Sequence, residues 1–74
     1  IMNIDTIKVI NYINKNRPGS HVGELIEVNI NRTHPSIPDG KGMLTFSGVD
    51  YKNELVGPDS FLIDINDFVS EVAV

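Results

Sequence analysis

The segment Ser60–Val74 constrains the fold of this 74-residue chain more than any other stretch. Its first half alternates with a period of two, as a strand buried on one face does: Phe61, Ile63 and Ile65 alternate with Leu62, Asp64 and Asn66. After Asn66 and Asp67 the alternation resumes out of phase, with Phe68, Val72 and Val74 on one face. This interruption predicts a bulge or tight turn, so that one segment serves two edges of a small barrel.

The N-terminal segment predicts a helix from Asn3 to Asn16. Isoleucines recur at every third position, which forms an apolar stripe along one side: Ile4, Ile7, Ile10 and Ile13. Pro18 and Gly19 end the helix. Ile, Val and Asn are mediocre helix formers, so we expect this helix to depend on packing against a sheet.

Strand patterns follow the helix. The first strand is expected at Val22–Asn31, with Ile26, Val28 and Ile30 on one side and Leu25, Glu27, Asn29 and Asn31 on the other. The second is expected at Met43–Lys52, with Leu44 and Phe46 inward. Gly48 predicts a bend or bulge in the second strand. Lys52-Asn53 and Gly57–Ser60 predict turns around a short strand at Glu54–Val56. Arg32–Gly42 is expected to be a long loop.

These elements predict a single domain, residues 1–74, of the mainly β (α+β) class. The preferred architecture is an N-terminal helix followed by a small antiparallel barrel, or strongly bent sheet, of four or five strands. Closure into a barrel hides the edges of short strands. The alternative is an open antiparallel sheet with the helix on one face.

The end of the chain resembles the small barrels of the Sm-like and SH3-like kind. In Sm-like proteins a late strand leads through a short turn into the closing strand, and Phe61–Ile65, Asn66-Asp67 and Phe68–Val72 are similar in layout. The resemblance implies a ring of subunits that binds RNA. Bacterial Sm-like proteins carry an RNA-contacting Lys-His pair just before the closing strand, where this chain has Asn66-Asp67.

The composition limits the cellular compartment and the side-chain chemistry that we expect for this protein. The absence of cysteine excludes disulfides and thiolate chemistry and suits a reducing cytoplasm. No apolar run has the length of a membrane helix. Because Ile1 precedes Met2, we expect Met2 to be the natural start of a whole small protein. Asn, Ile and Lys are used heavily, as is common in proteins encoded by AT-rich genomes, including those of many phages.

No residue pattern predicts catalysis, and we expect no catalytic residues, no metal and no cofactor. His21 and His34 lack the spacing of metal ligands. Ser20 and Ser36 lack a nucleophile motif. Pro38–Gly42 could cradle a phosphate, but ordinary turn chemistry accounts for it better. The sequence therefore predicts a protein that is not an enzyme.

The net charge of −4 is unevenly placed, because the second half of the chain is strongly acidic. We predict an acidic partner-binding surface of six residues: Asp50, Glu54, Asp59, Asp64, Asp67 and Glu71. A second contact is expected in the mildly cationic loop, at Arg32, His34, Asp39 and Lys41. These surfaces favour a protein partner, with a basic surface, over nucleic acid.

The sequence thus predicts a small protein–protein interaction module, a regulator or inhibitor from a phage or mobile element that acts on a host protein. The alternative is a ring-forming Sm-like barrel that binds RNA or a small anionic ligand where subunits meet, so a homo-oligomer is also considered.

Overall fold

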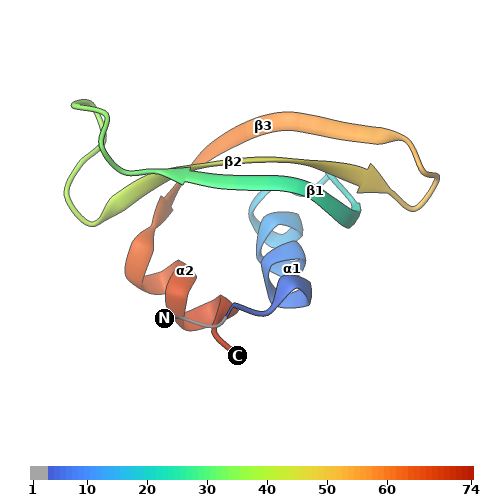
Figure 1. The fold of residues 1–74 in the computed structure, drawn as a ribbon, viewed down its shortest axis with the longest axis horizontal. Coiled ribbons are helices and arrows are strands. Elements are labelled where there is room, and N and C mark those ends of the chain that lie inside the picture. The colour runs from blue at the N-terminus through green and yellow to red at the C-terminus, as the bar shows by residue number, and fades with distance from the viewer. Residues whose placement is uncertain (1–3) are drawn as a thin grey trace.

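The computed structural model describes residues 4–74, which form three strands and two helices. The strands pair antiparallel in the order β1-β2-β3, and both helices lie on the same face of the sheet (Figure 1). The elements in chain order are α1 (Thr6–Asn16), β1 (Val22–Asn31), β2 (Lys41–Asp50), β3 (Leu55–Asp64) and α2 (Ile65–Val72).

The α+β class is confirmed, whereas the predicted barrel is replaced by an open sheet. Residues 4–74 form three strands rather than the predicted four or five. The sheet therefore has the arrangement of the alternative, an open antiparallel sheet, and the second helix joins the first on its covered face.

Helix α1 begins after Asp5, whose Oδ1 accepts hydrogen bonds from the amides of Ile7 (2.9 Å) and Lys8 (3.2 Å). Such a cap satisfies amides that have no partner inside the helix. The predicted end at Asn16 is confirmed, while the predicted start at Asn3 lies outside the described residues, as does Met2.

The buried side of α1 differs from the predicted isoleucine stripe. Val9, Tyr12 and Ile13 are buried, whereas Ile7 is 68% exposed. Positions three and four apart share a helix face, but a strict repeat of three drifts around the helix. The prediction that the isoleucine stripe is the buried side of the helix is therefore only partly correct.

Strand β1 has its predicted bounds, but its inward side changes at a bulge. The register with β2 shifts between Leu25 and Glu27, so Ile26 is an additional residue. Leu25 and Ile30, predicted on opposite sides of the strand, both pack against the core, whereas Ile26 is 62% exposed. In β2, by contrast, Leu44 and Phe46 are buried as predicted, and the register shifts next to Gly48.

The C-terminal half departs most from the prediction. Strand β3 runs without a break through Gly57–Ser60, the segment predicted to be a turn. The predicted closing strand at Phe68–Val72 is the helix α2, which buries Phe68 and Val72. These two residues are four positions apart and so lie on one face of a helix.

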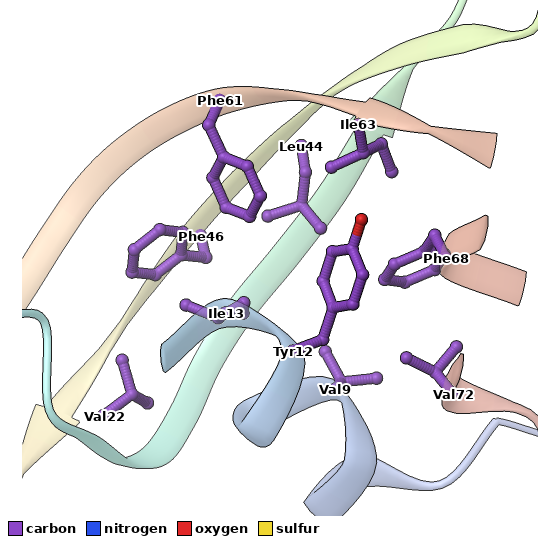
Figure 2. Close-up of a cluster of buried hydrophobic side chains, with 10 residues drawn as sticks. All are labelled: Val9, Tyr12, Ile13, Val22, Leu44, Phe46, Phe61, Ile63, Phe68 and Val72. Carbon is purple, nitrogen blue, oxygen red and sulfur yellow. The ribbon is translucent and has the colours of Figure 1, made fainter. Parts of the chain in front are cut away.

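The core lies between the sheet and the two helices (Figure 2). Tyr12 of α1 stands at its centre, with its ring centroid 6.3 Å from that of Phe61 and 5.1 Å from that of Phe68. Phe61 also meets Phe46, at 6.2 Å between ring centroids. The offset and edge-to-face contacts of these aromatic side chains join β2, β3 and both helices.

Candidate functional site

Five of the six acidic residues of the predicted surface lie in two places at opposite ends of the molecule, and Asp59 lies between them on β3. Asp50 and Glu54 lie at the turn between β2 and β3, whereas Asp64, Asp67 and Glu71 lie on or beside α2 (Figure 1). Strand β3 separates them, and ten extended residues span about 30 Å. The acidic residues therefore do not gather into one cluster.

Asp50 organises the first of these places, the turn between β2 and β3. Its Oδ1 accepts hydrogen bonds from the amides of Lys52 (2.8 Å) and Glu54 (3.0 Å). The Asp50 amide donates to the Glu54 carbonyl at 3.0 Å, and Asn53 adopts a φ of 64°. The hydrogen bond from Glu54 is the main cause that lowers the pKa of Asp50.

Two large apolar side chains project beside this turn. Tyr51 and Leu55 are each 79% exposed. We call the set of Asp50, Tyr51, Glu54 and Leu55 the hairpin tip. Exposed aromatic and aliphatic side chains next to acidic groups are a composition suited to protein contacts. Sequence reasoning missed Tyr51 and Leu55, although both flank the predicted Lys52-Asn53 turn.

The second acidic group surrounds the start of α2. Asp64 caps this helix, since its Oδ1 accepts a hydrogen bond from the Asp67 amide at 3.0 Å, and its Oδ2 lies 3.4 Å from Lys41 Nζ. The hydrogen bond from the Asp67 amide is the main cause that lowers the pKa of Asp64, and the hydrogen bond from the Lys41 side chain is the second. Glu71 pairs with Lys15 at 3.1 Å. This group is thus partly neutralised by cations.

Tyr12 lies within the field of the same carboxylates. Burial is the main cause that raises the pKa of Tyr12, and the charges of Asp67, Glu71 and Asp64 add to it. Asp67 and Glu71 lie on α2 and Asp64 directly precedes it, so the three carboxylates belong to one short helix and its cap.

Asp59 has a structural role between the two ends. Its Oδ2 lies 3.5 Å from Nε of Arg17, whose guanidinium carbon is 5.2 Å from the centroid of the Phe61 ring. Arg17 also donates a hydrogen bond to the Ser60 carbonyl at 2.9 Å. These contacts attach the end of α1 to β3.

The predicted loop contact is a hydrogen-bonded turn beside α2. His34 Nδ1 accepts from the Ser36 amide at 3.1 Å, and the Gly40 carbonyl accepts from the Ile65 amide at 3.0 Å. Arg32, His34 and Asp39 are exposed. Lys41 instead belongs to β2, where its ammonium group faces Asp64.

The predicted phosphate cradle has ordinary turn geometry. The Lys41 amide donates to the Pro38 carbonyl at 3.1 Å, and Gly40 has a φ of 81°. A positive φ is readily adopted by glycine in a turn. The geometry therefore matches the turn alternative.

Two hollows lie between elements. One, of about 200 Å³, separates α1 from α2 and is lined by Lys8, Asn11, Tyr12, Lys15 and Glu71. The other, of about 250 Å³, is lined by Ile4, Val9, Val28, Asn29, Ile30 and Phe68. We call this second, mostly apolar hollow the β1 groove.

Within residues 4–74, no three His, Asp or Glu side chains come together as metal ligands would. Neither of the described helices has the length and apolar character needed to cross a bilayer. In comparisons with known proteins, no family model, no curated protein and no solved structure matches this chain.

Proposed function

We propose that this chain is a non-enzymatic protein–protein interaction module that binds a host protein through the hairpin tip. The observation that carries the proposal is the pair of side chains Tyr51 and Leu55, each 79% exposed beside Asp50 and Glu54. Tyrosine is enriched among the residues that dominate binding energy. The partner we envisage has a basic surface with an apolar depression.

The hydrogen bonds of Asp50 favour this surface for binding. A turn that is already ordered loses less conformational entropy when it binds than a mobile loop does. Because Asp50 binds the amides of Lys52 and Glu54, the flanking Tyr51 and Leu55 project from a fixed support. The hairpin tip is therefore preorganised for contact.

Charge supports a basic partner. Among the described residues, Asp50 and Glu54 have no Lys, Arg or His nitrogen within 4.0 Å, unlike Asp59, Asp64 and Glu71. Acidic groups without an ion-pair partner at a contact steer a basic partner towards it and disfavour acidic ones. The α2 group, with Asp67 and the Arg32–Lys41 loop, is proposed as a secondary contact.

We further propose that the protein acts in the cytoplasm as a regulator or inhibitor, of the kind that phages and mobile elements encode. This part of the proposal depends on composition, an acidic pI of about 4.8 and no cysteine. The Sm-like ring alternative relied on a closing strand at Phe68–Val72, and α2 occupies that segment. No observation favours that alternative among the described residues.

The test is affinity capture from host lysate at physiological salt, with partners identified by mass spectrometry. We expect the wild-type chain to capture a specific protein, and the Tyr51→Ala/Leu55→Ala variant to bind it at least about 30-fold more weakly. Glu54→Lys should also weaken binding. Ile7→Ala is the matched control, because Ile7 is 68% exposed on α1.

One outcome would contradict this function, and another would contradict the hairpin tip as its site. One is the recovery of no specific partner. The other is a purified partner that binds the Tyr51→Ala/Leu55→Ala variant as tightly as it binds Ile7→Ala. In the second case a protein partner would remain, but the hairpin tip would not be its site.

A further inference from the structure

Asp39 is the only aspartate of the chain that a glycine follows. Asp39 and Gly40 are both exposed, in the turn that leads from the Arg32–Lys41 loop into β2. A backbone amide nitrogen can attack the side-chain carboxyl carbon of the aspartate before it and close a cyclic imide. Glycine favours this reaction, because it has no Cβ to obstruct the closing ring.

The two groups that would react are free of internal contacts. Among residues 4–74, the Asp39 carboxylate forms no hydrogen bond and no ion pair within 4.0 Å, and the Gly40 amide donates no hydrogen bond. The amides that follow two other aspartates are engaged. The Ser60 amide donates to Asp59 Oδ1 at 2.9 Å, and the Ile65 amide donates to the Gly40 carbonyl at 3.0 Å. The fold therefore leaves Asp39 and Gly40 free to react.

The turn permits the rotation that the reaction needs. The Lys41 amide donates to the Pro38 carbonyl at 3.1 Å, and Gly40 has a φ of 81°. These features are those of a type II turn with Asp39 and Gly40 at its centre. The peptide group between the two residues can turn over without a steric penalty, because glycine adopts either sign of φ. Such rotation brings the Gly40 nitrogen towards the Asp39 side chain.

We propose that Asp39 is a site of spontaneous isomerisation, at which the folded protein converts aspartate into isoaspartate. The Gly40 nitrogen forms a bond to Cγ of the Asp39 carboxylic acid, whose hydroxyl group leaves as water with the proton of the amide. Water then opens the imide. Cleavage of the bond between the nitrogen and Cγ restores aspartate, whereas cleavage at the backbone carbonyl carbon leaves the chain running through Cγ. Water is the only reagent in both steps.

Isoaspartate lengthens the backbone by a methylene group at a point that supports α2. The Gly40 carbonyl accepts the hydrogen bond of Ile65, the first residue of this helix. Lys41 Nζ lies 3.4 Å from Oδ2 of Asp64, which caps the helix. A longer turn displaces the Gly40 carbonyl and Lys41 from these partners, so the modification is expected to loosen the start of α2.

Peptide mapping tests the site, because trypsin places two aspartates in separate peptides. Residues 33–41 contain Asp39 as their only aspartate, and residues 42–52 contain only Asp50. After several weeks at physiological temperature and neutral pH, the folded wild-type chain should yield peptide 33–41 as two peaks of identical mass. The new peak should resist a protease that cleaves before aspartate. Peptide 42–52 should remain a single peak, since Asp50 is hydrogen-bonded and precedes Tyr51.

Asp39→Glu is the matched control, because glutamate keeps the charge but would have to close a larger, less favoured ring. This variant should show no second peak for residues 33–41. Thermal unfolding then measures the effect on α2, with the isomerised fraction of the wild type separated by ion exchange. Its Tm should be lower than that of fresh protein by about 4 °C, the scale of one hydrogen bond in a domain of this size.

The proposal is overturned if peptide 33–41 remains a single peak in the folded chain. Isoaspartate that forms only in the urea-unfolded chain would show that the fold protects Asp39. Equal conversion of Asp50 would overturn the selection of Asp39 by its surroundings, and an isomerised fraction with the Tm of fresh protein would overturn the effect on α2. None of these results involves a partner, so this proposal and the hairpin tip can fail independently.

Discussion

The carboxylate of Asp64 accepts a hydrogen bond from the Asp67 amide at 3.0 Å, so the residue that ends β3 also begins α2. This cap turns the chain from the sheet back onto its covered face. Phe68 and Val72 are thereby brought into the core next to α1. The second helix, rather than a closing strand, completes the fold.

Removing this cap should destabilise the protein. Asp64→Ala deletes the acceptor for the Asp67 amide and the partner of Lys41, and we expect the Tm to fall by about 4 °C or more. Asp64→Asn is the matched control, because asparagine also caps helices. Thermal unfolding followed by circular dichroism measures both, and equal losses for the two variants would contradict the capping role.

Acid should destabilise the fold through two carboxylates. The pKa values of Asp50 and Asp64 are lowered from an ordinary 3.8, chiefly by the amides of Glu54 and Asp67. A group whose pKa is lower in the folded state stabilises the fold above its unfolded pKa, and this contribution is lost as pH falls through the folded value. The free energy of unfolding should therefore fall below about pH 4.

Urea unfolding at about pH 6 and about pH 3 measures this loss. The variant D50N/D64N should show a smaller difference between the two pH values than the wild type. The exposed loop residue Asp39 provides the control, and Asp39→Asn should retain the wild-type difference. An unchanged difference in the double variant would show that other groups cause the acid sensitivity.

Alkaline conditions should destabilise the fold through the ionisation of Tyr12. Burial, and then the charges of Asp67, Glu71 and Asp64, raise the pKa of this residue above 10.0. Stability from a raised pKa is complete below the unfolded pKa and disappears as pH rises through the folded value. Tyr12→Phe retains the ring and loses the titration.

The expected result is a weaker loss of stability above about pH 10 in Tyr12→Phe than in the wild type. Urea unfolding across this range measures the loss. Tyr51→Phe, at the exposed hairpin tip, should follow the wild type. A parallel pH dependence in all three proteins would count against a titrating Tyr12.

Two glycines in paired strands should differ in their tolerance of alanine. A Cβ at Gly48 would collide with the backbone carbonyl oxygen of Glu24, whereas a Cβ at Gly23 would meet its nearest atom, Tyr51 Cδ1, at 3.4 Å. Gly48→Ala is therefore expected to lower the free energy of unfolding by about 2 kcal/mol, as overpacking does, and Gly23→Ala by less than about 1 kcal/mol. Urea unfolding of the two variants compares them, and similar losses would refute the close approach at Gly48.

Local sequence signals determined several elements correctly. The end of α1 at Asn16, the bounds of β1 and the turn at Lys52-Asn53 follow from breakers and alternation that act over a few residues. The burial of Leu44 and Phe46 also follows from alternation, because β2 is the central strand of the sheet.

The sequence left the state of residues 65–72 ambiguous. Phe68 and Val72 suit one side of a strand or one face of a helix, since their spacing of four is compatible with both periods. The cap at Asp64 and the packing of Phe68 on Tyr12 decide for the helix. Asp64 followed by Asp67 was the available local signal for it.

What the sequence by itself determined is the inventory of local features: a helix, two long strands and an acidic second half. Tertiary structure alone decided that β3 continues through Gly57–Ser60, because pairing with β2 outweighs the local preference of these residues for a turn. It also decided that the acidic residues divide between the hairpin tip and α2, with Asp59 between them on β3. The number of acidic residues in the sequence does not say how far apart they lie in space. The two groups are separated because β3 runs between them.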